Sequence, residues 1–284
     1  MQAWLFPQRV YLELQDQVIT AMALSGRQLI WMDQLSLPPG LCAGGRPLNT
    51  PALADLLGDW LVERGYAGAR ISAVLPGSAT ELRLLNSDGF DSLQRMLLPK
   101  EFEALRLPWP AETAVDLLRA SLPFCSGRSV SVAVEAALLE DWIALFADAG
   151  LVLDSLEAAP VCALRAAERQ SGMLLGLEPE QSWLLRLEQG APTWQWRLPP
   201  LTEAEPLHTE LSQCLSYWQP RTPQSSSIAV VASAALPASA LETLRLELEW
   251  IDPLAAGALE NGLSNSTELS LGLLWGLAAA EVQR

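Results

Sequence analysis

Two stretches of the chain share one pattern of short hydrophobic runs separated by turn residues. Residues 10–31 read VYLEL, a polar turn QDQ, VITAMAL, a turn SGR and QLIW. Residues 172–197 contain MLLGL, a turn EPEQ, SWLLRL, a turn QG and PTWQWR, in which Trp194 and Trp196 alternate with polar residues. Apolar runs of this length, bounded by Gly, Pro and polar residues, are typical of strands joined by tight turns. The pattern predicts two three-stranded units, one at the start of each half, and hence a duplicated architecture.

A helix and a buried strand are predicted to follow the first unit. Asn49-Thr50-Pro51 combines a helix-capping residue with a proline in the first turn. The next apolar positions fall on one helical stripe, and Gly65 ends the helix; they are Leu53, Leu56, Leu57, Trp60 and Leu61. Residues 69–75, ARISAVL, have the composition of a buried strand. Strands, helix and strand together indicate an α/β domain.

Residues 78–149 show a more mixed pattern, which we interpret as an inserted α+β subdomain. TELRLL (80–85), LQRMLLP (93–99) and the alternating VSVAV (130–134) predict strands or edge segments. Helices are predicted over 99–105, 111–120 and 135–149.

Strands and helices alternate again in the rest of the chain. Strands are predicted over 151–156, 227–232 and 248–251, and helices over 160–169, 208–218, 237–248 and 268–282. The last helix is apolar on most sides, which predicts that it is buried. The resulting domains are a first subdomain (1–77 plus 150–170), the inserted subdomain (78–149) and a second half (171–284).

Composition narrows the classes of partner. The net charge is −15, and no basic patch offsets it, so nucleic acid and anionic lipid surfaces are not expected partners. Four cysteines lie far apart without a Cys-x-x-Cys pair, no signal peptide is evident, and no apolar run of about 18 residues could span a membrane. A reduced, cytoplasmic protein without direct membrane insertion is therefore expected.

Several catalytic signatures are absent. Lys100 is the only lysine and has no neighbouring glycines, so there is no phosphate-binding P-loop. No G-x-G-x-x-G follows the first strand, and one histidine, His208, cannot build a multi-histidine metal site. No catalytic residue and no metal ligand is assigned on this basis.

The layout resembles the duplicated, ribonuclease H-like fold of the actin-like ATPases, and in particular PilM, the cytoplasmic actin-like protein of type IV pilus machines. The stretches that carry the resemblance are SLPPGL (36–41), ELRLL (81–85), LLPKEFEAL (97–105), VSVAVEAALLEDWIALFADAGLVLDSLEAAPVCAL (130–164), ELSQCLSYWQ (210–219) and LGLLWGLA (271–278). The L-type cytoplasmic domains of type II secretion share the fold and are similar.

The resemblance implies a nucleotide site, and the sequence departs from it in three loops. In the family, an Asp-x-Gly pattern in both hairpin turns and a glycine-rich adenosine loop hold nucleotide. Here the first turn carries Glu13, Gln15 and Asp16 without glycine, the second carries Glu178 and Glu180 around Pro179, and Ser233 stands in the third loop. These six positions predict a degenerate site and a pseudo-ATPase. No cofactor is expected, and ATP with Mg²⁺ would bind only if the altered site retained affinity.

The resemblance also implies a partner. We expect a scaffold held at the inner membrane by the N-terminal tail of a PilN-like protein, together with other pilus assembly platform proteins. The family's tail groove maps to Arg83, Leu84, Leu85, Leu98 and Pro99. Pilus motility, DNA uptake and secretion remain open as pathways.

Two alternatives to the scaffold remain. The first is an active ATPase or sugar-kinase-type enzyme in which Glu13, Asp16 or Glu178 holds Mg²⁺. The second is a filament-forming cytoskeletal homologue.

Overall fold

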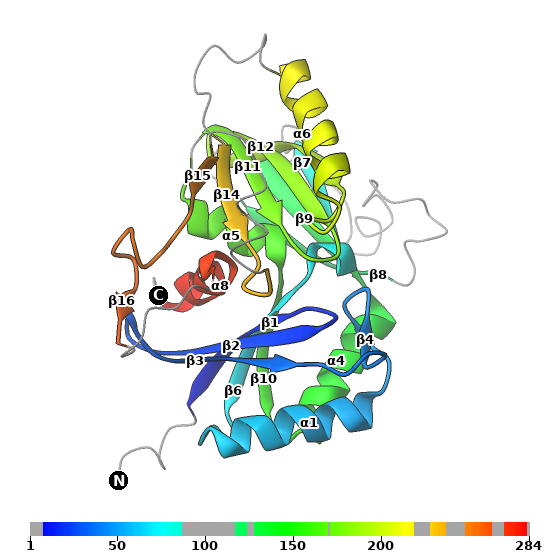
Figure 1. Ribbon diagram of the computed structural model, residues 1–284, viewed down its shortest axis with the longest axis vertical. Coiled ribbons are helices and arrows are strands. Elements are labelled where there is room, and N and C mark those ends of the chain that lie inside the picture. The colour runs from blue at the N-terminus through cyan, green and yellow to red at the C-terminus, as the bar shows by residue number, and fades with distance from the viewer. Residues whose placement is uncertain are drawn as a thin grey trace, which may run out of the picture.

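The computed structural model describes residues 8–86, 117–123, 128–169, 171–218, 228–236, 248–262 and 270–282. Two mixed α/β layers lie one above the other with helices between and outside them, and a small third sheet stands to one side (Figure 1).

The first sheet is built around the predicted N-terminal hairpin unit. Its strand order is β10-β6-β1-β2-β3-β16, with β1, β2 and β3 antiparallel and with β6 and β10 parallel to β1. The bounds are β1 (Arg9–Leu14), β2 (Val18–Ser25), β3 (Gln28–Ser36), β6 (Arg70–Leu75), β10 (Val152–Ala158) and β16 (Glu260–Asn261). The final strand of this sheet therefore comes from the C-terminal part of the chain.

The second sheet repeats this order. Its strands run β13-β12-β11-β14-β15, again an antiparallel triplet whose first strand pairs in parallel with the next strand along the sheet. They are β11 (Ser171–Leu177), β12 (Ser182–Glu188), β13 (Ala191–Leu198), β14 (Ile228–Ala232) and β15 (Leu248–Trp250). The predicted duplication is confirmed, because five consecutive strands of each sheet follow the same order.

The third sheet comes from the predicted insertion. Among the described residues it has the order β7-β9-β8, from β7 (Thr80–Asn86), β8 (Leu117–Pro123) and β9 (Arg128–Glu135). The helix predicted over 111–120 is wrong where it can be compared, because residues 117–123 form strand β8. Pairing of β8 with β9 outweighs the helical preference of its leucines and alanine. Two short strands, β4 (Cys42–Ala43) and β5 (Arg46–Pro47), occupy the predicted Pro/Gly loop.

Helices cover the outer faces of both large sheets. The side chain of Asn49 accepts a hydrogen bond from the amide of Ala52 (3.2 Å), so the predicted cap of α1 (Thr50–Glu63) is confirmed. Helix α4 (Ala136–Asp148) lies beside α1 and shares the core of the first sheet through Trp142 and Phe146. By packing, α4 therefore belongs with the first sheet, although it lies within the predicted insertion (78–149). Helix α6 (Ala204–Trp218) covers the second sheet, and the 3-10 turn η1 (Gly77–Ala79) follows β6.

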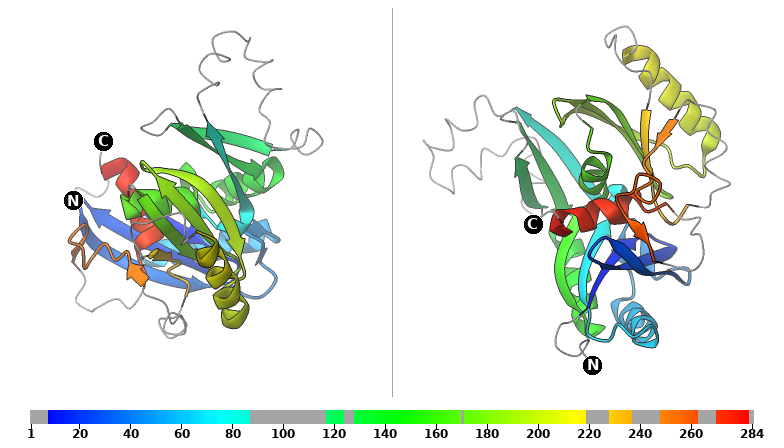
Figure 2. Two further views of the ribbon diagram at one scale, coloured as in Figure 1. Left: turned by 90° about the horizontal axis from the view of Figure 1, so that it is seen from above. Right: turned by 90° about the vertical axis from the view of Figure 1, so that its left-hand side faces the viewer.

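Two helices fill the space between the sheets. Figure 2 shows α8 (Gly272–Val282) running between the first and second sheets, where it packs on α5 (Ala159–Ala167), β1, β6 and β14. Residues 271–279 of this segment are all buried, as the apolar pattern predicted. The two helix backbones meet at Gly276, because a Cβ there would lie 1.8 Å from the carbonyl oxygen of Cys162. No side chain fits without moving one helix.

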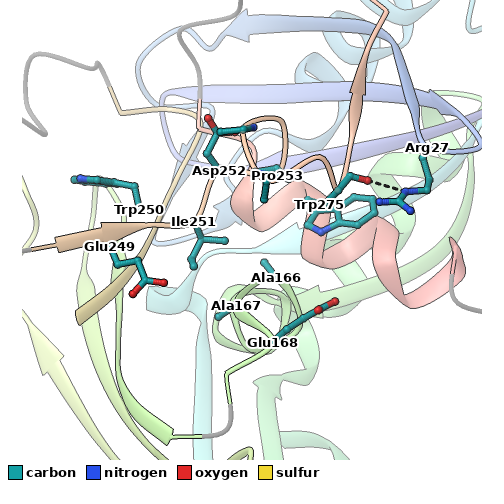
Figure 3. Close-up of a pocket in the computed structure, with 13 residues that line it drawn as sticks. Arg27, Ala166, Ala167, Glu168, Glu249, Trp250, Ile251, Asp252, Pro253 and Trp275 are labelled. Atoms are coloured by element: carbon teal, nitrogen blue, oxygen red, sulfur yellow. Dashed lines mark hydrogen bonds between the residues drawn. The ribbon is translucent and has the colours of Figure 1, made fainter. Parts of the chain in front are cut away.

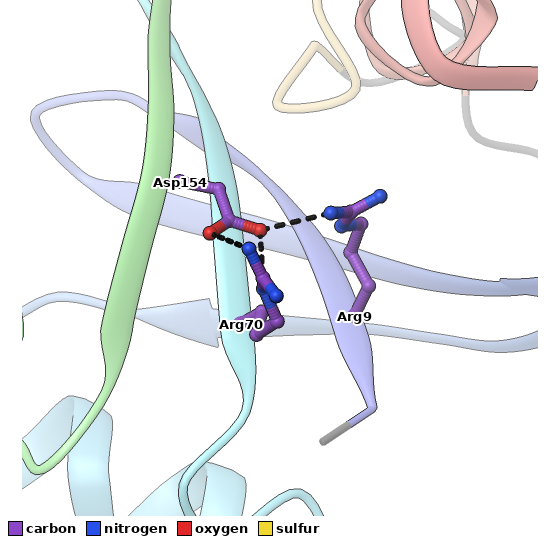
Figure 4. A network of polar contacts seen from close by, with 3 residues as sticks. All are labelled: Arg9, Arg70 and Asp154. Atoms are coloured by element: carbon purple, nitrogen blue, oxygen red, sulfur yellow. Dashed lines mark hydrogen bonds and ion pairs between the residues drawn. The ribbon is translucent and has the colours of Figure 1, made fainter. Parts of the chain in front are cut away.

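An ion-pair cluster fixes the beginning of three parallel strands (Figure 4). Asp154 is the extra residue at a register shift in β10, and its carboxylate accepts two hydrogen bonds from Arg70 (both 2.7 Å) and one from Arg9 (2.9 Å). The hydrogen bonds and charge of Arg70, together with those of Arg9, hold the pKa of Asp154 below its ordinary value. One carboxylate from β10 thus ties together β1 and β6.

The close approach of α5 and α8 gives a stability prediction. Gly276→Ala should lower the free energy of unfolding by about 3 kcal/mol, because the added methyl group forces two packed helices apart. Urea titration followed by circular dichroism measures this change. Ala280→Gly, at a partly exposed position of the same helix, should cost only about 1 kcal/mol. Equal losses in the two variants would contradict the packing argument.

Candidate functional site

The six positions predicted for a degenerate nucleotide site meet at the junction of the two halves. The duplicated topology brings the β1–β2 turn, the β11–β12 turn and the loop after β14 together, with η1 beside them. Hydrogen bonds connect these four segments, and the side chains that make them are largely buried.

Glu13 lies near the end of β1 and is 1% exposed. Its carboxylate accepts hydrogen bonds from the Ser233 hydroxyl and from the backbone amide of Ala234 (3.1 Å), both in the loop after β14. The side-chain amide of Gln15 donates a third hydrogen bond (3.3 Å). A carboxylate from the first half is therefore bound by donors of the second half.

Glu178 shows the converse arrangement. It begins the turn after β11, is also 1% exposed, and accepts a hydrogen bond from the backbone amide of Gly77 in η1 (2.9 Å). The Trp183 indole N–H (2.5 Å) and the Gln15 side-chain amide (3.4 Å) complete its shell. Gln15 thus donates one hydrogen bond to each buried glutamate.

Asp16 and Glu180 form a second, outer pair. Asp16 accepts hydrogen bonds from the backbone amides of Gly44 (2.7 Å) and Gly45 (2.8 Å), in the turn between β4 and β5. Its own backbone amide donates to Glu180 (3.2 Å). Trp142 of α4 fixes the same turn, since its indole N–H donates to the carbonyl oxygen of Gly45 (2.8 Å).

Burial dominates the electrostatics of the glutamate cluster. Desolvation raises the pKa of Glu13 and of Glu178 from the ordinary value of 4.5 to about 7, although their hydrogen-bond donors oppose the shift. Desolvation and the charge of Asp16 also raise the pKa of Glu180. Among the described residues, amide, hydroxyl and indole groups solvate these carboxylates, and no arginine pairs with them.

This arrangement is poorly suited to a nucleotide phosphate. Backbone N–H groups at such turns are the usual ligands of an anion, and here the amides of Gly77 and Ala234 are already bound by carboxylates of the chain itself. Pro179 contributes no N–H to the second turn. The described residues contain no group of three or more potential metal ligands.

Two donors of the cluster were not predicted from the sequence. Gly77 lies just after the predicted strand over 69–75, and Trp183 lies within the predicted hydrophobic run SWLLRL. A Cβ on Gly77 would lie 2.8 Å from the carboxylate of Glu178, which shows why glycine stands there. Gly77 follows β6 and Trp183 lies within β12, and no motif in the sequence marks either of them as a donor to Glu178.

The predicted partner groove is only partly described. Arg83, Leu84 and Leu85 lie on β7, paired in register with β9, and β7 is an outer strand of its sheet among the described residues. Strand β13 lies next to β7 and β9. Leu98 and Pro99 lie outside the described residues. The groove assignment stays a prediction.

A separate pocket of about 680 Å³ opens between the end of α5, the segment after β15 and α8 (Figure 3). Trp275 lines it beside alanines of α5, while the carboxylates of Glu168, Glu249 and Asp252 lie on its walls. The guanidinium of Arg27 is engaged by backbone carbonyl oxygens, including that of Ala258 (2.9 Å). Carboxylates outnumber the cation among these residues, so the pocket does not offer a second phosphate site.

Solved structures of known proteins share this fold. The PilM-PilN type IV pilus biogenesis complex matches with a TM-score of 0.71 at 18% identity, covering 98% of this chain and 99% of that one. The cytoplasmic domain of EpsL, an inner membrane component of the type II secretion system of Vibrio cholerae, matches with a TM-score of 0.56 at 12% identity, covering 96% and 95%. The ethanolamine utilization protein EutJ of Carboxydothermus hydrogenoformans gives 0.52 at 13% identity, covering 96% and 89%.

These matches identify the class of protein. No family model and no curated protein matches the sequence. The chain has the actin-like ATPase fold, and the fold prediction is confirmed. Within that class its architecture is similar to PilM along nearly the whole chain, which confirms the predicted resemblance at the level of fold. The described part of the chain contains no helix long and apolar enough to cross a membrane.

The raised pKa values of Glu13 and Glu178 predict a dependence of stability on pH. The folded state binds more protons than the unfolded state between about pH 4.5 and pH 7, so the free energy of unfolding falls as pH rises through this window. We expect each of the two glutamates to contribute a loss of roughly 2–3 kcal/mol between pH 5 and pH 8, measured by urea titration at each pH. The pKa values of Asp33 and Asp154 are lowered, so these two carboxylates change protonation below this pH window and do not contribute to the decline within it.

Glu178→Gln removes one of these titrating groups and should make the decline shallower. Glu63→Gln, at an exposed position of α1, serves as the matched control and should keep the wild-type slope. A wild-type stability that rises between pH 5 and pH 8 would disprove the assignment.

Proposed function

We propose that this chain is a scaffold of a type IV pilus, or of a related secretion or DNA-uptake, assembly platform. The observation that carries the proposal is the similarity to the PilM-PilN complex structure, which covers 98% of this chain and 99% of the matched chain. The similarity to cytoplasmic EpsL, from a second inner-membrane machine, supports the same type of role. The protein would be cytoplasmic and peripheral at the inner membrane, held there by a partner and working with other platform proteins.

The proposed partner is the N-terminal tail of a PilN-like inner-membrane protein. An extended peptide adds readily to the open edge of a sheet, where main-chain hydrogen bonds give affinity and side-chain pockets give specificity. Strand β7, which carries Arg83, Leu84 and Leu85, is such an outer strand among the described residues. The acidic charge of the chain favours a tail with basic residues.

The scaffold is further proposed to work without ATP hydrolysis. Four carboxylates lie where the fold would place the phosphates, and each of them already accepts a hydrogen bond from a backbone N–H. Coulomb repulsion in a buried site would add to the cost of bringing in a triphosphate. The alternative, an ATPase or sugar-kinase-type enzyme, would need Glu13, Asp16 or Glu178 to release these donors and hold Mg²⁺.

A calorimetric titration with ATP and Mg²⁺ separates these alternatives. We expect no binding at micromolar nucleotide and at most millimolar affinity, because the donors are occupied and the site is anionic. Micromolar binding, or measurable phosphate release, would favour the enzyme instead.

Binding of the tail can be tested by fluorescence anisotropy with a labelled peptide of the PilN-like protein from the same organism. We expect saturable binding and roughly ten-fold weaker affinity for Arg83→Ala, from the loss of a charge-assisted hydrogen bond. Arg64→Ala, at the C-terminal cap of α1 in the first half, is the matched control and should bind like the wild type. Absence of binding, or equal weakening by both substitutions, would disprove the proposed groove.

A further inference from the structure

The two buried glutamates are held by opposite halves of the molecule. Glu13 belongs to β1 of the first half, and its ligands Ser233 and Ala234 belong to the loop after β14 of the second half. Glu178 belongs to the second half and is bound by Gly77 of the first half. We propose that these two carboxylates are intramolecular ligands that hold the two halves together at the position where this fold otherwise binds nucleotide. We call Glu13, Glu178 and the groups that donate hydrogen bonds to them the latch.

The Glu13 side of this latch is supported through both backbone polar groups of one residue, Ala234. The backbone amide of Ala234 donates to Glu13 (3.1 Å), while its carbonyl oxygen accepts from the side chain of Gln34 on β3 (2.8 Å). Gln34 also donates to Thr20 of β2 (3.0 Å), so its orientation is fixed by the first sheet. The amide of Ser233 donates to the carbonyl oxygen of Leu177 (2.8 Å), which ties the same loop to the second sheet. The loop is thus a rigid connection between the two halves.

The Glu178 side depends on two positions that lack a side chain. Gly77 has an ordinary backbone conformation, but a Cβ there would lie 2.8 Å from the Glu178 carboxylate and 2.9 Å from the Trp183 ring. A Cβ on Gly176 would lie 2.0 Å from the same ring. The two glycines therefore hold the indole in one orientation, in which its N–H donates to Glu178.

Gln15 joins the two sides. Its side-chain amide donates to Glu13 (3.3 Å) and to Glu178 (3.4 Å), so each carboxylate contacts a group that also contacts the other. Every donor in this network is neutral, which is the donor set that binds an anion at a turn. A carboxyl group supplied by the chain is an acceptor for these donors that cannot dissociate into solution. The inference does not depend on the proposed partner tail.

Truncation followed by chemical rescue tests the latch directly. Glu→Ala removes two carbons and two oxygens, which are the heavy atoms of acetate, and leaves the opposing donors without an acceptor. Glu13→Ala and Glu178→Ala should each lower the melting midpoint by roughly 5–10 °C. Sodium acetate should restore a substantial part of this loss in a saturable manner, relative to sodium chloride at the same ionic strength.

The matched control is Leu174→Ala, a fully buried apolar position on β11. It should lose a comparable amount of stability, because it creates a cavity without exposing hydrogen-bond donors, and acetate should not restore it. If acetate restores neither glutamate variant, or restores all three variants equally, the proposal is overturned. If a glutamate variant does not fold in chloride, refolding in acetate alone supports the proposal and refolding in neither salt overturns it.

Hydrogen–deuterium exchange adds a readout that general destabilisation would not produce. Glu13→Ala should accelerate exchange in the second-half segment 233–236, and Glu178→Ala in the first-half segment around Gly77, with acetate reversing each effect. Acceleration spread evenly over both halves in either variant would overturn the latch. Neither measurement includes nucleotide or a partner, so failure here is distinct from failure of the tail-binding experiment.

Discussion

The structure depends on two carboxylates buried at the junction of its halves. Removing a carboxylate from water is costly, and neutral donors offset that cost only when several converge on the same group. Glu13 and Glu178 each receive three hydrogen bonds, and at least one comes from the opposite half. The relative position of the two sheets is therefore coupled to the hydrogen bonding of two buried carboxyl groups. Helices α5 and α8 secure the same junction by close packing at Gly276.

The duplicated topology explains why such a junction exists at all. Each half begins with an antiparallel triplet whose first turn lies next to the parallel strand that follows, so the equivalent turns of the two halves come face to face. The two halves nevertheless use the turn differently. Glu13 lies within strand β1, whereas Glu178 lies just beyond the end of β11. The repeated topology places the two turns next to each other, and the side chains in each turn determine which groups are bound there.

Much of this arrangement could be predicted from local patterns. The two hairpin units, the cap at Asn49 and the buried final helix follow from spacing and composition, because each is determined by neighbours in sequence. The six loop positions could be grouped only through the resemblance to a known fold, since Glu13 and Ser233 are 220 residues apart. Residues 117–120 of strand β8 were predicted as the end of a helix over 111–120, because the pairing of β8 with β9 is a tertiary contact that a leucine-rich segment does not reveal.

The hydrogen-bond partners of the carboxylates could not be predicted from local patterns. From the sequence, Glu178 and Glu180 were grouped with the positions of a degenerate nucleotide site, where their negative charge lies beside the expected phosphates. In the structure, Glu178 points inward to the amide of Gly77, and Glu180 receives the amide of Asp16, so these donors are occupied rather than merely exposed to repulsion. Under the proposed function, donors that are occupied by the chain's own carboxyl groups would hold the halves in one relation, and a fixed surface would bind an extended tail with little ordering cost. In the proposed latch, the carboxyl groups of Glu13 and Glu178 accept the hydrogen bonds that a separate anionic ligand would otherwise accept.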